Sequence, residues 1–355
     1  MTTTTSVPLS PGDIAMNEFC GISTATYYPG QLPIDFLRKR TTEIIEKNPW
    51  LTSTLKKNTQ SNTLCAVFSS DPVQSEDYFN VVNVPAFEPS FQSASRALKD
   101  FQIRKGKECI DNDEKLFKVT AVSVGDSKAE TVLIVSLSHT LADGFTFYSI
   151  YSMFEKTPYP MTFERVDGFA DQSVVANLAT APPPIVQYEI DLGVIEKEKE
   201  KTKKDVEYVS TNDVVTSTFL SNSGINYGMM ALNMRGRVSS VTNNHAGNYE
   251  GSIVLMPANF ESPASVRTAL KKFKLDAFPT FLQACLGKNA VVSNWASFHH
   301  DLKFEGGLKP VDHHPLERDS VHMIWSTGII YKPTAERLAL LYGDTKKANG
   351  VNLFQ

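Results

Sequence analysis

The sequence predicts an α/β protein of two halves, and three observations support this prediction. At 355 residues the chain is longer than one average domain of about 150 residues. Runs rich in β-branched residues alternate with segments whose apolar residues recur at helical spacing. Hydrophobic residues make up 41% and charged residues 21% of the chain, which favours an ordered globular protein over a disordered one.

Composition and charge argue against several functional classes. The chain has 35 Lys and Arg against 39 Asp and Glu, so a net charge of −4 does not suggest a nucleic-acid partner. The longest apolar strand, Val132 to Leu137, is far shorter than the ~18 residues that span a bilayer. The N-terminal stretch MTTTTSVPLSPGD lacks the pattern of a secretory signal. No CxxC pair occurs among the scattered cysteines, Cys20, Cys65, Cys109 and Cys285. We therefore expect a cytoplasmic protein without a membrane span.

The first half alternates strand and helix patterns. A helix is predicted after Pro33, with Leu37, Ile44 and Ile45 on one face, ending before Pro49. Further helices are predicted at 91–103 and after Asp143, and strands at 9–20, 51–55, 63–68, 117–124 and 131–137.

The middle of the chain predicts a crossover between two domains. The periodic pattern stops from Pro158 to Pro184, and a run of alternating charge follows from Glu196 to Lys204, typical of a solvated helix. Beyond it we expect helices from Thr211, at 263–273 and at 278–287, and strands at 228–238, 250–256, 321–331 and 337–341. The predicted organisation is an N-terminal subdomain at 1–157, a linker at 158–209 and a C-terminal subdomain at 210–355.

The most informative segment runs from Thr131 to Phe145. A buried strand ends before His139, and Asp143 and Gly144 begin the next helix. An imidazole has an ordinary pKa of about 6.5, which suits it to accept a proton near neutral pH. The Asp143 carboxylate could orient the histidine, cap the helix or pair with a distant arginine. A single histidine in such a place is more often structural than catalytic.

The pattern His139-x-x-x-Asp143-Gly144 resembles the active-site motif of the BAHD acyltransferases. These belong to the wider chloramphenicol acetyltransferase-like superfamily, which includes the condensation domains of peptide synthetases. Other segments resemble the same family in the same order along residues 10 to 345. They are 17–55 with Tyr27-Tyr28 and Asn48-Pro49-Trp50-Leu51, Ser210-Thr211-Asn212-Asp213-Val214-Val215, Leu232 to Arg237, Gly247-Asn248-Tyr249 and Ser293-Asn294-Trp295.

Two departures from the family's patterns, together with a chain shorter than most plant members, point to a lineage outside the plant enzymes. The family's Asp-Phe-Gly-Trp-Gly stretch is replaced at 304–308 by Phe-Glu-Gly-Gly-Leu, although the following Lys309-Pro310 matches. Position 138 is serine, where condensation domains usually carry a second histidine.

The resemblance implies two chloramphenicol acetyltransferase-like subdomains, each a mixed β-sheet with flanking helices, and an active-site channel between them. It further implies that acyl-CoA or CoA is a cosubstrate, that no cofactor is permanently bound and that the chain is a monomer. The acceptor would be a small molecule with a hydroxyl or an amine.

The resemblance also assigns roles to individual residues. His139 is the general base, and Asp143 completes the catalytic pair by anchoring its loop to Arg235, with Arg237 as the second candidate. Gly144 serves the backbone geometry of that loop. Ser293 and Trp295 would line the position of the oxyanion, with the alternative that they serve packing alone.

Other constellations support competing functions less well. The pairs His299-His300 and His313-His314 lie beside aspartates, but neighbouring residues on a strand face opposite sides, so we expect no metal site. His245 and His322 are expected to be solvated or satisfied in the core. No GxSxG, GxGxxG or GxxxxGK[ST] pattern occurs, which argues against serine hydrolases and nucleotide-cofactor enzymes.

The sequence therefore predicts an acyl-CoA-dependent acyltransferase that forms an ester or an amide without a covalent acyl-enzyme. Two alternatives stay open. The donor could be a thioester on a carrier protein, as in condensation domains, or the chain could be a degenerate acyltransferase fold retained as a binding protein.

Overall fold

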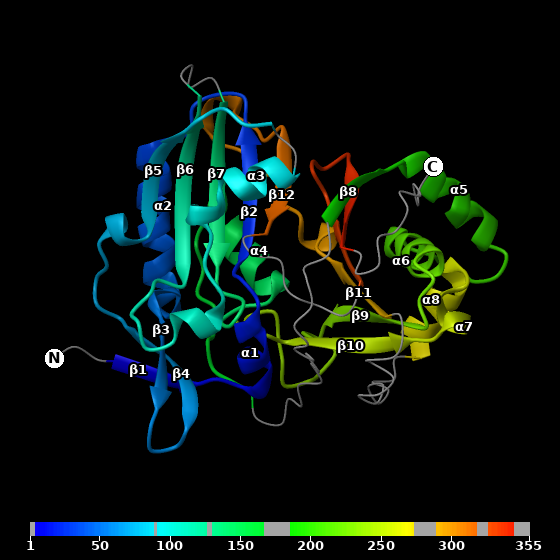
Figure 1. Cartoon of the computed structure of the whole chain (residues 1–355), viewed down its shortest axis with the longest axis horizontal. Coiled ribbons are helices and arrows are strands. Elements are labelled where there is room, and N and C mark those ends of the chain that lie inside the picture. Colours follow the sequence, from blue (N-terminus) through cyan, green and yellow to red (C-terminus); the bar gives the residue numbers. More distant parts are fainter. Residues whose placement is uncertain are drawn as a thin grey trace. The chain divides into compact units, whose positions relative to one another are not determined.

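The computed structural model describes residues 4–88, 91–125, 130–166, 185–272, 289–317 and 326–343. Two compact units are present (Figure 1). The first comprises Met1–Asp171, Met234–Tyr249 and Phe298–Val321, and the second comprises Gln172–Asn233, Glu250–Ser297 and His322–Gln355. Two segments from the second half of the chain thus belong to the first unit. The division predicted from the sequence assigns one continuous stretch of chain to each part, at 1–157, 158–209 and 210–355. It stays a prediction.

The first unit is built around a five-stranded sheet within the described residues. Its strand order is β12 (Asp312–Leu316), β2 (Ile22–Tyr28), β7 (Glu130–Leu137), β6 (Phe117–Val124) and β5 (Phe79–Val84). All neighbours are antiparallel except β5 and β6, which are parallel. The strands expected at 117–124 and 131–137 are confirmed. The edge strands β5 and β12 were not predicted, because β5 is only partly buried and β12 reads Asp-His-His-Pro-Leu.

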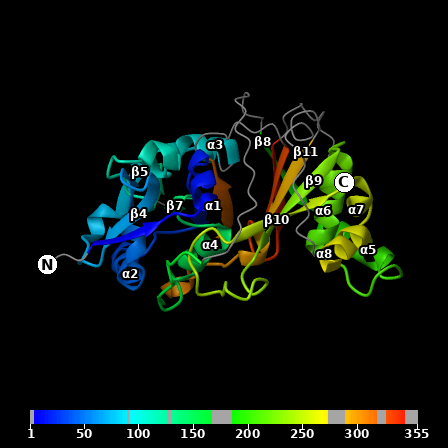
Figure 2. The same ribbon diagram turned by 90° about the horizontal axis from the view of Figure 1, so that it is seen from below.

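Helices pack on both faces of this sheet (Figure 2). Successive side chains of a strand point to opposite faces, and β2 shows the consequence. Ala25 and Tyr27 join the hydrophobic cluster that includes Ala94 of α3 (Phe91–Ala97). Between them, Thr26 contacts the Tyr151 hydroxyl of α4 (Gly144–Ser152) at 2.7 Å. The α4 face of the sheet therefore carries buried polar groups.

The remaining helices of the first unit mostly agree with expectation. The helix predicted after Pro33 is confirmed as α2 (Ile34–Lys47), which buries Leu37, Ile44 and Ile45. The helix expected at 91–103 is shorter, because α3 ends at Ala97 and a 3₁₀ turn follows at Lys99–Phe101. The strand expected at 51–55 is replaced by a 3₁₀ turn at Pro49–Thr52 and by β3 (Thr54–Asn58).

The strand predicted at 9–20 is wrong. This stretch follows β1 (Thr4–Pro8) and forms α1 (Pro11–Ala15) and a 3₁₀ turn at Met16–Glu18. Ser10 caps α1 in a capping box with Asp13, and Pro11 occupies its first turn, where a proline loses no hydrogen bond. β1, β4 (Thr63–Ser69) and β3 form a separate antiparallel sheet, which confirms the strand expected at 63–68.

The second unit contains a six-stranded mixed sheet in the described residues. Its order is β10 (Glu250–Leu255), β9 (Tyr227–Asn233), β11 (Asn289–Asn294), β13 (Ser326–Tyr331), β14 (Leu338–Gly343) and β8 (Ile185–Ile190). β11 runs parallel to β9 and β13, and the other pairs are antiparallel. Figures 1 and 2 show helices grouped on one face of this sheet, namely α5 (Leu192–Thr202), α6 (Thr211–Asn222), α7 (Pro257–Phe260) and α8 (Pro263–Lys272).

Several predictions for the second unit are confirmed. The charged run forms α5, with intrahelical pairs such as Lys199–Glu196, and the helices expected from Thr211 and Pro263 are α6 and α8. β9 ends at Asn233 rather than 238, because the chain turns at Gly236 with a φ of +72°. The predicted helix at 278–287 lies outside the described residues.

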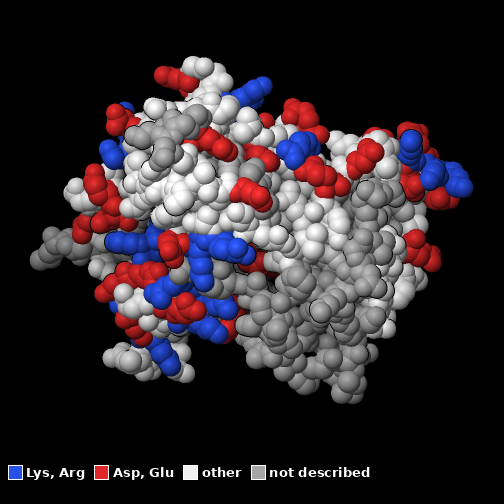
Figure 3. Space-filling model, turned by 45° about the horizontal axis from the view of Figure 1, so that its top comes forward, with Lys and Arg blue, Asp and Glu red and all other residues white. Residues whose placement is uncertain are grey.

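The described surface carries charges of both signs. On the face shown in Figure 3, Lys and Arg side chains gather in one area, and Asp and Glu lie among them. Ion pairs of the first unit include Lys56–Asp113 at 2.7 Å and Arg104–Glu114. No helix in the described ranges is both long and apolar enough to cross a bilayer.

His313 makes the stability of the first unit depend on pH. Its imidazole is buried, with Nδ1 2.9 Å from Thr26 Oγ1 and Nε2 3.1 Å from the Tyr148 hydroxyl. Burial lowers the pKa of His313 well below its ordinary value, and His299 and His314 lower it further. The folded state therefore holds this imidazole neutral, whereas the unfolded chain protonates it below a pH of about 6.5.

We expect His313 to weaken folding by up to about 1.4 kcal/mol per pH unit as the pH falls below about 6.5. Urea unfolding of the wild type and of His313→Asn at pH 7.5, 6.5 and 5.5 measures this contribution. The variant should lose less stability across the range, because it lacks the proton-binding group. Equal losses in the two proteins would contradict the prediction.

Candidate active site

His139 lies just past the end of the central strand β7. Its predecessor Ser138 still donates its backbone N–H to the Leu116 carbonyl at 2.8 Å, and Leu141 N–H donates back to the Ser138 carbonyl at 3.0 Å. The strand and this tight turn hold the backbone of His139 on both sides. The imidazole is half-buried, and its ring lies 5.9 Å from the ring of Phe19. The position is rigid and leaves part of the side chain accessible.

Asp143 is buried and has donors at both carboxylate oxygens. Oδ1 accepts the backbone N–H of Thr146 at 2.8 Å, which caps α4. Oδ2 accepts from Arg235 Nη1 at 2.6 Å and from the backbone N–H of Tyr249 at 3.0 Å. Of the three roles left open by the sequence, the carboxylate thus caps the helix and pairs with an arginine.

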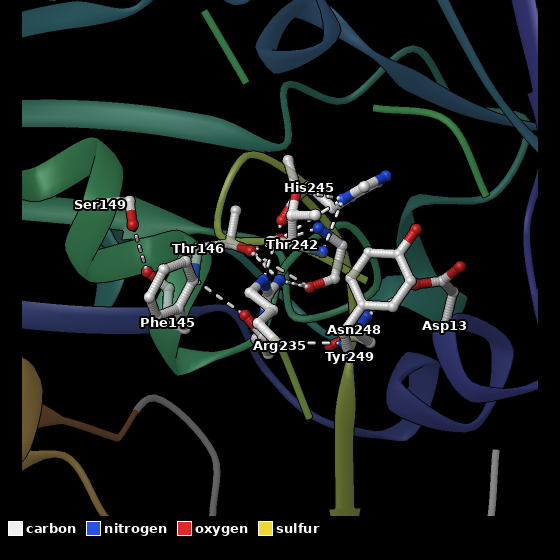
Figure 4. Close-up of polar contacts among 12 residues, drawn as sticks. Asp13, Phe145, Thr146, Ser149, Arg235, Thr242, His245, Asn248 and Tyr249 are labelled. Carbon is white, nitrogen blue, oxygen red and sulfur yellow. Dashed lines mark hydrogen bonds and ion pairs between the residues drawn. The ribbon is translucent and has the colours of Figure 1, made fainter. Parts of the chain in front are cut away.

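Arg235 completes a network that ties the histidine loop to residues 245–249 (Figure 4). Nη2 donates to Thr146 Oγ1 at 2.9 Å and to the Gly247 carbonyl at 3.1 Å, and Nε donates to the His245 carbonyl at 2.9 Å. The guanidinium also lies over the rings of Phe145 and Tyr249, 4.5 Å and 5.1 Å from their centroids. The buried charge is therefore well compensated.

Tyr249 is neutral in this setting. Burial raises the pKa of its phenol, and its hydroxyl donates to the Glu164 carbonyl at 2.7 Å.

Arg237 and Gly144, which were also predicted to support the loop of His139, play smaller parts. Arg237 is exposed, and Gly144 is the first residue of α4. The glycine with a positive φ in this network is Gly247, at +145°.

Two residues of the site, Asn248 and Asp13, were not predicted from the sequence. Asn248 Oδ1 lies 3.2 Å from His139 Nδ1, and Asn248 Nδ2 donates to Asp13 Oδ1 at 2.9 Å. Asn248 belongs to the Gly-Asn segment that resembles the family, and this position is the one sequence signal for it. Asp13 was missed because a strand was predicted at 9–20. The Ser10-x-x-Asp13 spacing, which indicates a capping box, is the signal that could have found it.

Ser293 and Trp295 lie in the second unit, at the end of β11. The indole N–H of Trp295 donates to Ser293 Oγ at 3.1 Å, and the Trp295 backbone N–H donates to the Ile330 carbonyl at 2.8 Å. The Ser293 hydroxyl therefore accepts one bond and keeps its own proton for another acceptor. Their relation to His139 stays a prediction.

The segment that departs from the family at 304–308 forms a closed turn in the first unit. Phe304 N–H donates to the Leu308 carbonyl at 2.9 Å, and Gly306 and Gly307 have φ values of +76° and +78°. Phe304 is buried against the rings of Tyr28 and Phe36, 5.4 Å and 6.0 Å away. The altered residues thus have a structural role of their own.

The histidine pairs His299-His300 and His313-His314 lie in the first unit. His313 and His314 are neighbours on the strand β12, where His314 Nε2 lies 2.9 Å from Asp312 Oδ2. His299 Nε2 lies 2.7 Å from Asp301 Oδ1, and His300 Nε2 lies 2.8 Å from Glu155 Oε2. Over the described part of the chain, no three His, Cys, Asp or Glu residues gather as metal ligands would.

No protein-family model and no curated protein sequence matches the chain significantly. Solved structures do resemble it along almost its whole length. Polyketide synthase associated protein 5 from Mycobacterium tuberculosis is 13% identical, with a TM-score of 0.66 and coverage of 98% of this chain and 95% of its own. F. graminearum TRI101 in complex with ethyl coenzyme A is also 13% identical, with a TM-score of 0.67 and coverage of 96% and 94%.

The first condensation domain of the CDA synthetase is 11% identical, with a TM-score of 0.65 and coverage of 98% of this chain and 93% of its own. The TM-scores establish the architecture, whereas identities this low leave the chemistry to the site itself. The mixed α/β architecture and the breadth of these likenesses lead to one conclusion: the chain has the fold of the chloramphenicol acetyltransferase-like superfamily.

Proposed function

We propose that the protein transfers an acyl group from an acyl-CoA thioester to a hydroxyl or an amine of a small-molecule acceptor. One observation carries the proposal. A half-buried histidine stands at the end of a central strand, in a loop held by the buried Asp143–Arg235 pair, on a fold that binds CoA in TRI101. This arrangement meets the need of acyl transfer for a base held rigidly where a substrate can reach it.

The proposed mechanism uses His139 as the general base and forms no covalent acyl-enzyme. The imidazole takes the proton of the acceptor hydroxyl or amine as the acceptor oxygen or nitrogen attacks the thioester carbonyl. The tetrahedral oxyanion then collapses, the carbon–sulfur bond breaks, and the imidazolium returns the proton to the departing CoA thiolate. Asp143 and Arg235 hold the loop, and we propose the Ser293 hydroxyl, beside Trp295, as an oxyanion donor.

The donor could instead be a thioester on a carrier protein, and the likeness to a condensation domain is the observation that favours this second candidate. Both donors offer the same thioester carbonyl to the acceptor that His139 deprotonates, so the mechanism is unchanged. We also propose that the protein works as a monomer.

Binding of a donor can be tested without knowledge of the acceptor. We expect a CoA thioester of matching acyl length, at a hundred times its Kd, to stabilise the protein by about 2.7 kcal/mol. For a chain of this size the midpoint of thermal unfolding should rise by several degrees. The measurement is thermal unfolding of the wild type and of His139→Ala against CoA thioesters of increasing acyl length. The variant should bind equally well, because His139 acts on the acceptor.

A shift that peaks at one acyl length would support the CoA donor and identify its acyl group. If no CoA thioester shifts either protein, the same acyl groups on a phosphopantetheinylated carrier protein are tested next. Absence of a response to both kinds of donor would contradict acyl transfer and favour a degenerate binding protein.

A further inference from the structure

The side-chain amide of Asn248 can adopt only one orientation. Its Nδ2 atom faces three oxygens, Asp13 Oδ1 at 2.9 Å, the His139 carbonyl at 2.8 Å and the Thr140 carbonyl at 3.4 Å. Carbonyl and carboxylate oxygens only accept hydrogen bonds. A flipped amide would therefore set its oxygen against three other oxygens in a buried site, at the cost of every one of these bonds.

This orientation determines which nitrogen of His139 carries the proton. Asn248 Oδ1, which can only accept, lies 3.2 Å from His139 Nδ1. The contact is a hydrogen bond only if Nδ1 is protonated. In a neutral imidazole Nε2 then keeps its lone pair, because the hydrogen bond at one ring nitrogen sets the role of the other. A general base at Nε2 requires this tautomer.

Asp13 holds the Asn248 amide in place. Its carboxylate is 0% exposed, and its Oδ2 accepts from the backbone N–H and the hydroxyl of Ser10 at 2.9 Å and 2.8 Å. The other carboxylate oxygen, Oδ1, takes no part in the capping box and accepts from Asn248. Because the capping box of α1 already fixes the carboxylate, the acceptor that Asn248 meets does not move.

Arg165 balances the buried charge of Asp13 and reaches the backbone beside Asn248. Nε donates to Asp13 Oδ2 at 2.6 Å, and Nη1 donates to the Ala246 carbonyl at 3.2 Å. The guanidinium lies 4.2 Å from the ring centroid of Phe163. A Cβ atom at Gly247 would come within 2.8 Å of Arg165 Nη1, so this close approach requires glycine.

We propose that Arg165, Asp13 and Asn248 form a positioning chain that holds His139 in the tautomer with the proton on Nδ1. The proposal deepens the proposed function, because it explains how Nε2 is kept free to accept the proton of the acceptor. The three residues act through His139 and need not touch a substrate.

The second unit provides a matched control for this chain. Asp213 is also 0% exposed, forms a capping box with Ser210 and accepts from Arg267 Nε at 2.8 Å. Its Oδ1, however, has no hydrogen-bond partner among the described residues, whereas Asp13 Oδ1 accepts from Asn248. Asp213→Asn therefore disturbs the same kind of capping box and arginine contact without disturbing an asparagine bound to a histidine.

The tautomer is read directly by NMR of the full chain with ¹⁵N-labelled histidine, in the absence of substrate. Spectra are recorded at pH 8.5, where an ordinary imidazole is neutral. The His139 signals are assigned by their loss in His139→Ala. We expect a protonated Nδ1 and an unprotonated Nε2 in the wild type and in Asp213→Asn. Asn248→Ala should shift the population to a protonated Nε2, and Asp13→Asn should give a mixture.

A wild-type His139 with its proton on Nε2 would overturn the proposal, whether or not any variant folds. An unchanged tautomer in Asn248→Ala would overturn it too, and an unchanged tautomer in Asp13→Asn would remove Asp13 from the chain. In the transfer assay Asn248→Ala should lower kcat by about tenfold to a hundredfold with little change in the KM of the donor. If the expected tautomers are found in a protein that transfers no acyl group, the proposed function fails and the positioning chain stands.

Discussion

Replacing His139 by alanine should lower acyl transfer by about two to four orders of magnitude, the usual contribution of a general acid–base group. The loss should fall on kcat, because the imidazole takes its proton only as the acceptor attacks. Binding of the donor should persist. The measurement is the release of free CoA thiol with the acyl-CoA identified by thermal unfolding, in the presence of small alcohols and amines.

The fold of this variant should be intact. The side chain is half-buried, and the bonds that shape its loop are made by the backbone of His139 and by the Asp143–Arg235 pair. His300→Ala is the matched control, because it removes a half-buried histidine of the same unit that pairs with Glu155. We expect this control to keep wild-type turnover. A His139→Ala protein with near wild-type turnover would contradict the general-base assignment.

Asp143→Ala should lower the free energy of unfolding by about 3–5 kcal/mol, the typical cost of leaving one charge of a buried pair without its partner. In the ion pair with Asp143 the Arg235 side chain is 0% exposed, so its guanidinium would lose its charged partner away from water. The variant also loses the N-cap of α4 and the acceptor for the Tyr249 backbone N–H. Turnover should fall with stability, because these bonds hold the loop of His139. Urea unfolding and the transfer assay measure the two effects.

Two further variants separate the causes of this loss. Asp191→Ala removes a capping carboxylate from the exposed start of α5, where it accepts from Gly193 N–H at 2.7 Å, and should cost only about 1 kcal/mol. The double variant Asp143→Leu/Arg235→Leu should be less destabilised than Asp143→Ala, because no charge stays buried alone. An Asp143→Ala protein that loses no more stability than Asp191→Ala would show that the buried pair contributes little.

Local patterns were sufficient to predict much of the fold. The strands β6 and β7 are continuous β-rich runs, and α2 carries its apolar residues on one face. The spacing of neighbouring residues was therefore enough to predict these three elements. The errors fell where local patterns conflict or are weak. Pro8 and Pro11 suggested the start of a strand, although the capping box of Ser10 and Asp13 starts a helix there. The edge strand β5 is only partly buried, which weakens its pattern.

The sequence alone determined the histidine and its loop, because a strand that ends at Leu137 and a helix capped by Asp143 depend on neighbours in the chain. Tertiary structure decided which distant residues complete the site. The resemblance named Arg235 as the partner of Asp143 with Arg237 as the second candidate, and the fold brings Arg235 to the carboxylate. Asn248 lies about a hundred positions from His139, Asp13 contacts Asn248 from another element, and Arg165 contacts Asp13. Such contacts arise only when burial removes water and leaves each donor and acceptor to find a partner inside the protein.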